Sequence, residues 1–165
     1  MDNRPIGIMD SGVGGLTVAC VLKEKYPNEK FIFIGDTARN PYGNKSPEEV
    51  TFFAEEMKAF LAGKQVKMII AACNTITFSV PPSFFEGKIP VGMSLDFPEL
   101  ESVNHLAVIG TPMTIRSHRH RDRLKKDFPL MNVTEIPIDG LAYAIEMGKE
   151  ESFIYRMINK AVQKA

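Results

Sequence analysis

Residues 67–78 read Lys67-Met-Ile-Ile-Ala-Ala-Cys-Asn-Thr-Ile-Thr-Phe78, and this stretch decides the fold class. Met68 to Ala72 form an unbroken apolar run that is too short for a helix and suits a strand covered on both faces, as in a parallel sheet. Cys73, Asn74 and Thr75 follow at the carboxyl end of that strand, the edge where open α/β sheets bind their ligands. The stretch predicts a parallel α/β fold with a chemical site at Cys73.

Cys73 has two interpretations. A free cysteine is usually buried and inert, so Cys73 taken alone can be a small core residue. A helix that begins just after the strand would favour the anionic form of the thiol and make the same residue reactive. The polar residues beside Cys73 favour the reactive interpretation.

The composition describes a globular chain without a strong overall charge. With 165 residues, of which 44% are hydrophobic, it can bury the core of one domain or of one and a half small ones. Twenty basic residues balance twenty acidic ones, so no global field favours nucleic acid or an anionic membrane. No apolar run approaches the roughly 18 residues that a membrane span requires. Cys20 and Cys73 form no CxxC motif and, without a secretory leader, fit the reducing cytoplasm.

The first part of the chain reads as alternating strands and helices. We expect strands over residues 4–10, 31–35, 68–72 and 89–92, and helices over residues 16–25 and 47–63. Ser46 and Pro47 are typical of a helix start. Cys20 is expected to pack in the core. The other side chains expected to face inward from the two helices are Leu16, Val18, Ala19, Leu22, Phe52, Phe53, Met57, Phe60 and Leu61.

A glycine-rich turn, Ser11-Gly-Val-Gly-Gly15, follows the first strand. Thr17 stands where a dinucleotide-binding fingerprint needs its last glycine, and no Gly-Lys-Ser/Thr follows, so neither phosphate-binding fingerprint is met. The turn still lets the backbone approach a small ligand, with Asp10 and Ser11 at the carboxyl end of the strand. Asp10 taken alone is equally a turn or helix-capping carboxylate.

A polar loop, Asp36-Thr-Ala-Arg-Asn-Pro-Tyr-Gly43, follows the second strand. It holds too many turn residues for a plain connection, and we expect it to close over a ligand. Tyr42 and Gly43 either present backbone donors to a carboxylate or form an ordinary Pro-Tyr-Gly turn.

The strand and helix pattern restarts after residue 95, and a domain junction is expected at Asp96-Phe-Pro98. Strands are expected over residues 105–110 and 133–138, a turn over residues 111–114, and helices over residues 115–128, 141–147 and 151–165. The prediction is a first α/β domain, residues 1–95, that carries Asp10 and Cys73, and a partial second α/β domain, residues 96–165. Two strands with flanking helices make a thin domain, so this part is a fragment or leans on a partner.

The basic stretch Arg116-Ser-His-Arg-His-Arg-Asp-Arg-Leu-Lys-Lys126 is the strongest local charge feature. Asp122 and Asp127 interrupt it, and no aromatic residues are interleaved for base stacking. We interpret it as the solvated face of an amphipathic helix rather than a nucleic-acid site. His118 and His120 do not share a helical face, and no metal site is expected.

Four blocks of the sequence resemble the glutamate racemases of the cofactor-independent aspartate/glutamate racemase family: Asp10-Ser-Gly-Val-Gly-Gly-Leu-Thr-Val18, Asp36-Thr-Ala-Arg39, Pro41-Tyr-Gly43 and Ala72-Cys-Asn-Thr75. The resemblance is strong over residues 4–80 and weaker through residues 108–115. It implies two similar α/β domains that face each other across a substrate cleft. It also implies cofactor-free interconversion of L- and D-glutamate, with the D form feeding peptidoglycan synthesis.

The proposed chemistry makes sense from the residues. The α-proton of an amino acid is weakly acidic, so the site alone must stabilise the carbanion with a thiolate, polar groups and a closed, dry cleft. By resemblance, Cys73 is the base for the α-hydrogen of the D enantiomer, and Asp10 tunes and orients Cys73. The substrate-binding residues that the resemblance implies are Ser11, Tyr42, Gly43, Asn74 and Thr75, with Thr111 and Thr114 from the second domain.

The sequence departs from the family pattern at the second base. Family members carry a second cysteine, in a Gly-Cys-Thr-His block later in the chain than residue 165, and their last segments complete the first domain. With Cys73 alone a chain exchanges the proton on one face, and Cys20 cannot substitute from a helix core. Two alternatives stay open: a one-cysteine decarboxylase or isomerase of the same superfamily, and a non-catalytic remnant that binds an amino acid or a protein. A homo-oligomer is expected to cover the exposed cleft face.

Overall fold

A computed structural model describes residues 2–87, 89–92, 100 and 102–164. The chain divides into two compact units, unit 1 (residues 1–93) and unit 2 (residues 94–165). The junction expected at residues 96–98 lies outside the described residues, so the domain border stays a prediction.

Unit 1 is built on a four-stranded parallel sheet with the strand order β2-β1-β3-β4. Because the strands are parallel, all their carboxyl ends lie at one edge of the sheet. This arrangement confirms the predicted α/β fold class. The strands are β1 (Ile6–Asp10), β2 (Phe31–Gly35), β3 (Met68–Ala71) and β4 (Val91–Gly92).

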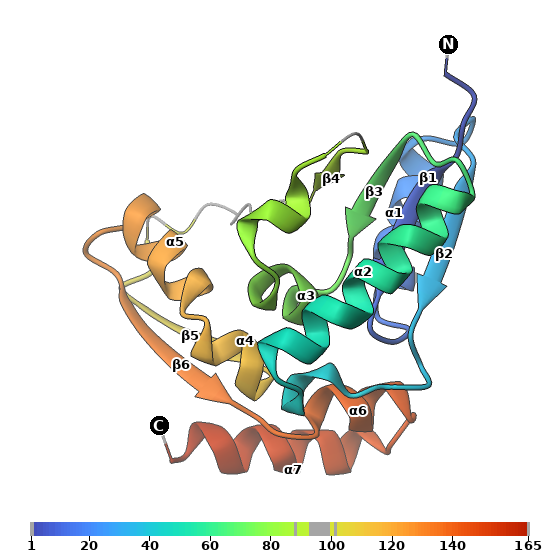
Figure 1. The fold of residues 1–165 in the computed structure, drawn as a ribbon. Helices are drawn as coiled ribbons and strands as arrows, with labels where there is room; N and C mark the ends of the chain where they lie inside the picture. The colour runs from blue at the N-terminus through green and yellow to red at the C-terminus, as the bar shows by residue number, and fades with distance from the viewer. Residues whose placement is uncertain (1, 88, 93–99, 101, 165) are drawn as a thin grey trace. The chain divides into compact units, whose positions relative to one another are not determined.

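Helices cover both faces of this sheet. The two longer ones, α1 (Leu16–Lys25) and α2 (Pro47–Gly63), lie over opposite faces (Figure 1). The side chain of Ser46 accepts a hydrogen bond from the backbone N–H of Glu49, and the carboxylate of Glu49 accepts one from the backbone N–H of Ser46, so α2 begins as its sequence predicts. The shorter helices are η1 (Tyr42–Asn44), α3 (Asn74–Ser79) and η2 (Pro82–Phe85).

The face that α2 buries differs from the predicted one. Val50, Ala54, Met57 and Leu61 are buried, and their spacing of three to four residues places them on one side of the helix. Successive residues of a helix are turned by about 100°, so Phe52 and Phe60 point away from this buried side. The prediction that Phe52 and Phe60 face inward is therefore wrong: they are 61% and 48% exposed.

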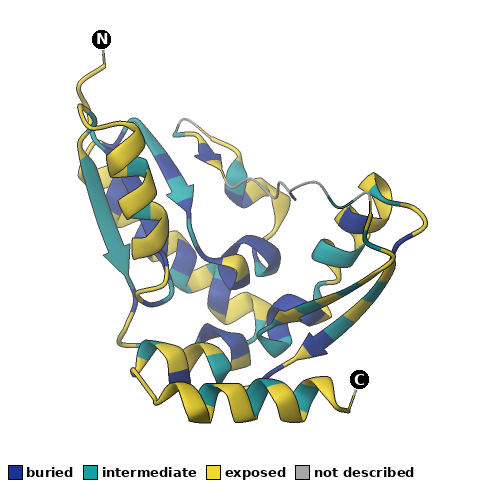
Figure 2. Ribbon diagram, turned by 180° about the vertical axis from the view of Figure 1, so that it is seen from behind, coloured by how far each residue is buried: buried dark blue, intermediate teal, exposed yellow. Residues whose placement is uncertain are grey.

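Helix α1 packs less deeply than expected. Every residue of α1 is described and none is buried; Ala19 and Leu22, three residues apart, form its half-buried side (Figure 2). Cys20 is turned by about 100° from Ala19 and is exposed, so its predicted place in the core is wrong. Leu16 and Val18, also predicted to face inward, are exposed as well.

The strand buried on both faces is β1 rather than β3. All five residues of β1 are buried, whereas β3 alternates between buried and half-buried side chains. Ile69 and Ala71 point into the core shared with α2, while Met68 and Ile70 are half-buried on the other face. The apolar run at residues 68–72 correctly predicts a parallel strand but overstates its burial.

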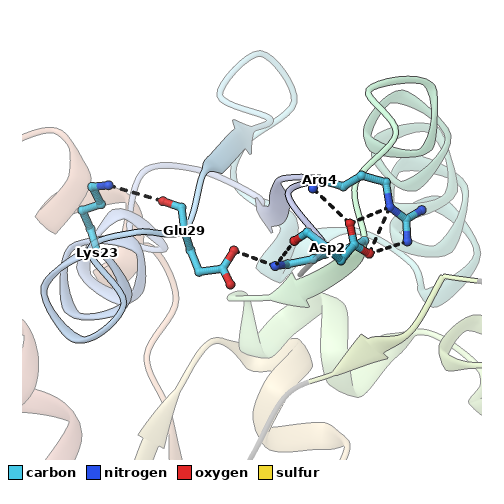
Figure 3. A network of polar contacts seen from close by, with 5 residues as sticks. Asp2, Arg4, Lys23 and Glu29 are labelled. Carbon is cyan, nitrogen blue, oxygen red and sulfur yellow. Dashed lines mark hydrogen bonds and ion pairs between the residues drawn. The ribbon is translucent and has the colours of Figure 1, made fainter.

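Polar groups tie the strands together at the amino edge of the sheet. Lys67, just before β3, donates to the backbone carbonyl of Asp2 at 3.0 Å and to the carboxylate of Glu29 at 2.6 Å. Asp2 also pairs with Arg4, and Lys23 of α1 reaches the carbonyl of Glu29 (Figure 3). These contacts leave the opposite, carboxyl edge for the side chains predicted to carry the chemistry.

Unit 2 holds a parallel pair of strands, β5 (His105–Gly110) and β6 (Asn132–Pro137). The helix predicted over residues 115–128 is instead two helices, because His118 adopts the left-handed conformation with φ 55°. The first begins at Pro112, where a turn was expected, with the Thr111 side chain as its cap. The helices of unit 2 are α4 (Pro112–Arg116), α5 (Arg119–Asp127), α6 (Leu141–Glu146) and α7 (Glu151–Val162).

Candidate functional site

The carboxyl edge of the sheet in unit 1 brings three loops together. The backbone N–H of Ala72 donates to the carbonyl of Met9, and that of Asp36 donates to the carbonyl of Asp10, at 2.9 and 3.0 Å. The segments that follow β1, β2 and β3 therefore start side by side. Of the predicted residues, Asp10 ends β1, and Ser11 and Cys73 lie on these segments.

Cys73 caps the amino end of α3. Its sulfur accepts a hydrogen bond from the backbone N–H of Ile76 at 3.5 Å and lies 3.2 Å from the hydroxyl oxygen of Ser11. The residue is only 6% exposed. Cys73 is thus a buried thiol that is also hydrogen-bonded, which combines features of both interpretations of the sequence.

The thiol of Cys73 is held in its neutral form. Burial raises its pKa to about 11, and the negative charge of Asp10 adds to this effect. Hydrogen bonds from Ser11 and from the backbone of Ile76 act in the opposite direction but do not outweigh burial. The helix start does favour the thiolate, as expected, through the N–H group of Ile76, but burial outweighs this effect and the net pKa is raised.

Asp10 anchors the glycine-rich turn. One carboxylate oxygen accepts the backbone N–H of Ser11 at 2.8 Å, and the other accepts that of Gly15 at 2.5 Å. A Cβ atom on Gly15 would lie 2.9 Å from the Cβ atom of Asp10, so the turn requires glycine there. Asp10 is consequently a turn carboxylate, and its charge also acts on Cys73.

Tyr42 is a buried residue of the same core cluster as Cys73. Its hydroxyl donates to a carboxylate oxygen of Asp36 at 2.5 Å, and burial together with this carboxylate raises the pKa of Tyr42 well above its usual value. Helix η1, which holds Tyr42 and Gly43, packs against α3. The two residues therefore lie on a segment that packs against the helix that Cys73 caps.

Asp36 and Arg39 belong to this site although the sequence-based prediction gives them no role. The Nε atom of Arg39 donates to Asp36 at 2.5 Å, its Nη1 atom pairs with Glu56 of α2, and its guanidinium lies 4.1 Å from the ring centre of Phe53. The signal was present in the sequence: Asp36-Thr-Ala-Arg39 places an acid and a base three residues apart, just before Tyr42.

The remaining predicted residues fall into two groups. Asn74 and Thr75 are the first two residues of α3; Asn74 is exposed and Thr75 is buried. Thr111 and Thr114 lie in unit 2, where the Thr111 hydroxyl oxygen accepts the backbone N–H of Thr114 at 3.3 Å. These two threonines shape the start of α4, and their part in a substrate site stays a prediction.

The described residues lack two further features. No group of three or more His, Cys, Asp or Glu side chains in the described ranges is arranged to hold a metal ion. None of the helices in the same part of the chain combines the length and apolar character needed to cross a membrane.

Known proteins are similar to this chain in sequence and in fold. No protein-family model matches the chain. The glutamate racemase of Streptococcus thermophilus is 40% identical over 165 residues, which cover 96% of this chain and 60% of that relative. The chain spans about three fifths of the length of the curated relatives it matches.

Solved structures give the same result. The glutamate racemase of Francisella tularensis in complex with D-glutamate has a TM-score of 0.77 and 40% identity, over 90% of this chain and 58% of that one. A glutamate racemase isoform of Bacillus anthracis has a TM-score of 0.84 and 28% identity, over 99% of this chain and 64% of that one. By sequence and by fold, the chain is homologous to glutamate racemases over most of its own length.

Proposed function

We propose that the chain carries one half of a glutamate racemase site, in which the Cys73 thiolate removes the α-proton of glutamate. The observation that carries the proposal is the meeting of the Ser11 hydroxyl with the Cys73 sulfur, 3.2 Å apart, beside the buried carboxylate of Asp10. The relatives named glutamate racemase, one of them in complex with D-glutamate, support the choice of substrate.

The proposed step moves one proton from the α-carbon of the substrate to the sulfur of Cys73. The thiolate sulfur of Cys73 takes the α-proton and becomes a thiol, and the electron pair of the broken C–H bond stays on the substrate carbon and its carboxylate. A thiol whose pKa is raised to about 11 is a stronger base once ionised, which suits a weakly acidic carbon. Its cost is a small thiolate population near neutral pH, which Ser11 partly offsets by hydrogen bonding to the sulfur.

Substrate binding is assigned to residues around this thiol. Asn74 and Thr75 begin the helix that Cys73 caps, and η1 packs against that helix. We propose that Ser11, Asn74 and Thr75, together with Tyr42 and Gly43, hold the carboxylates and amine of glutamate. Thr111 and Thr114 are proposed as further contacts from unit 2, and no cofactor takes part.

Full inversion needs a second acid on the opposite face of the substrate. Cys20, the other cysteine of the sequence, lies exposed on α1, so we do not assign it that role. The proposed activity of Cys73 is exchange of the α-proton on one face, and racemisation would supply D-glutamate for peptidoglycan. Two free cysteines support the cytoplasm as the location.

We also propose that the chain associates with copies of itself. Large apolar side chains are exposed on the last two helices, and exposed apolar groups of this size favour association. Light scattering that shows a mass rising with concentration supports this, and a monomer at high concentration contradicts it. The residues are Tyr143, Ile145, Phe153 and Tyr155.

The test of the proposed function is α-proton exchange in D2O, followed by NMR with L- and D-glutamate separately. We expect exchange of D-glutamate, loss of exchange in Cys73→Ala, and unchanged exchange in the matched variant Cys20→Ala. Exchange that survives Cys73→Ala contradicts the proposal. Exchange with inversion would show that another group supplies the second proton, and no exchange in the parent would favour a binding remnant.

A further inference from the structure

The side chain of Arg39 joins two parts of unit 1 that lie far apart in sequence. Its Nε atom donates to Asp36, at the start of the loop after β2, and its Nη1 atom pairs with Glu56 in the middle of α2. The guanidinium also lies 4.1 Å from the ring centre of Phe53, on the same helix. Arg39 thus bridges the loop to α2 through two ion pairs and a cation–π contact.

The Asp36 end of the bridge connects Arg39 to Tyr42. The Asp36 oxygen that accepts from Arg39 also accepts the hydroxyl proton of Tyr42. The ring of Tyr42 packs 5.4 Å from that of Phe53, centre to centre. Tyr42 is therefore held at its hydroxyl and at its ring, and Arg39 contacts both partners that hold it.

Tyr42 shares a buried core with Cys73, so movement of Tyr42 would disturb the surroundings of the thiol. Tyr42 and Cys73 belong to one buried cluster, and η1 packs against the helix that Cys73 caps. The peptide groups of Tyr42 and Gly43 form part of η1, so their positions depend on the same anchor.

We propose that Arg39 is a positioning residue, which fixes Tyr42 and Gly43 beside Cys73 by bridging Asp36 to Glu56. The proposal rests on the proposed function for its substrate, glutamate. Arg39 does not touch the thiol; it acts through Asp36 and Tyr42. Loss of the bridge lets η1 move away from α3, which opens the route to the buried sulfur and weakens the hold on the substrate carboxylate.

The experiment measures alkylation of Cys73 by iodoacetamide at one mildly alkaline pH, in a Cys20→Ser background. Arg39→Met keeps an apolar stem over Phe53 and removes both ion pairs. We expect it to raise the rate about fivefold, because a partly exposed ion-pair bridge resists local opening by about that factor. Arg4→Met is the matched control, since Arg4 pairs with Asp2 at the opposite edge of the sheet, and its rate stays at that of the parent.

A second comparison separates positioning from loss of stability. Leu61→Ala destabilises the far end of α2. Its alkylation rate and its free energy of unfolding in urea, compared with those of the parent, show how much faster Cys73 reacts for a given loss of stability. Arg39→Met must react faster than its own loss of stability explains. A rate that this loss of stability explains, or one that equals that of the parent, overturns the proposal.

Glu56→Ala provides a milder variant at an exposed helical position. It breaks only the ion pair between Arg39 and Glu56, so its alkylation rate lies between those of the parent and Arg39→Met. The double variant reacts like Arg39→Met, because Arg39→Met already removes the contact that Glu56→Ala removes. A double variant whose effects add contradicts the bridge.

D-glutamate separates this proposal from the proposed function. We expect D-glutamate to slow alkylation of the parent. Protection of Arg39→Met should need about tenfold more D-glutamate, because a smaller fraction of the variant chains holds the binding geometry. If D-glutamate protects neither chain, the proposed function fails, while the ligand-free rates still decide the role of Arg39. Equal protection of both chains overturns the positioning role.

Discussion

The hydroxyl oxygen of Ser11 lies 3.2 Å from the sulfur of Cys73, although the two residues are 62 positions apart in the sequence. They meet because β1 and β3 pair in parallel, so the residues that follow each strand emerge at the same edge. A hydroxyl at this distance can donate to a thiolate and stabilise it. The contact therefore links the fold of unit 1 to the acidity of its buried thiol.

Replacement of Ser11 by alanine should raise the pKa of Cys73 further. The Ser11 hydroxyl lowers this pKa by hydrogen bonding to the sulfur, and alanine removes that donor. The measurement is the pH dependence of Cys73 alkylation in a Cys20→Ser background, with Ser152→Ala on α7 as the control. A pKa that stays the same or falls would show that Ser11 does not donate to the sulfur.

Asp10→Asn should lower the pKa of Cys73 and destabilise unit 1. The Asp10 charge raises the thiol pKa, and its two oxygens accept the N–H groups of Ser11 and Gly15. An asparagine side chain accepts at one atom only, so we expect a loss of about 1 to 3 kcal/mol in the free energy of unfolding. Alkylation and urea unfolding measure the two effects, and Asp2→Asn, at an exposed ion pair, is the control. Unchanged stability contradicts the anchoring role.

Stability should fall in alkaline solution because of Cys73. Folding raises the pKa of its thiol from about 9 to about 11, so the folded chain holds this proton more tightly than the unfolded chain does. The resulting stabilisation is complete below about pH 9 and is lost as the pH rises through about 11; two pKa units correspond to about 2 to 3 kcal/mol. Urea unfolding at each pH should show a steeper decline for the parent than for Cys73→Ala. Parallel curves would contradict the raised pKa.

Two glycines beside the site should not tolerate a side chain. A Cβ atom on Gly35 would lie 2.1 Å from the carbonyl oxygen of Gly12, and one on Gly15 would lie 2.9 Å from the Cβ atom of Asp10. We expect Gly35→Ala and Gly15→Ala each to lower the free energy of unfolding by about 1 to 3 kcal/mol. Gly63→Ala is the control, because nothing lies within 4 Å of its Cβ position and alanine suits a helix. Equal effects at all three glycines contradict the packing.

The sequence predicts the elements of unit 1 well because local rules determine them. Apolar runs mark the strands, and Ser46 with Pro47 marks the start of α2 at Pro47. The inward faces of the helices were harder to predict. Phe52 and Phe60 are apolar but exposed, since Val50 and Leu61 fix which side of α2 meets the sheet.

Other features depend on contacts that periodicity does not contain. The break between α4 and α5 comes from the left-handed backbone of His118, whose ring nitrogen lies 2.6 Å from the carboxylate of Glu135 on β6. In the site, sequence reasoning identified Asp10, Ser11 and Cys73, which the structure brings together. The bridge at Arg39 depends on Glu56, seventeen residues away on α2.

The most direct test of Cys73 as the base is the pH dependence of deuterium incorporation at the α-carbon of D-glutamate. Because the thiolate is the reacting form and the pKa of the thiol is raised to about 11, the exchange rate should rise about tenfold per pH unit between neutral pH and about pH 9. Cys73→Ala should show no such rise. A rate that does not change with pH, or one that Cys73→Ala retains, would contradict the account.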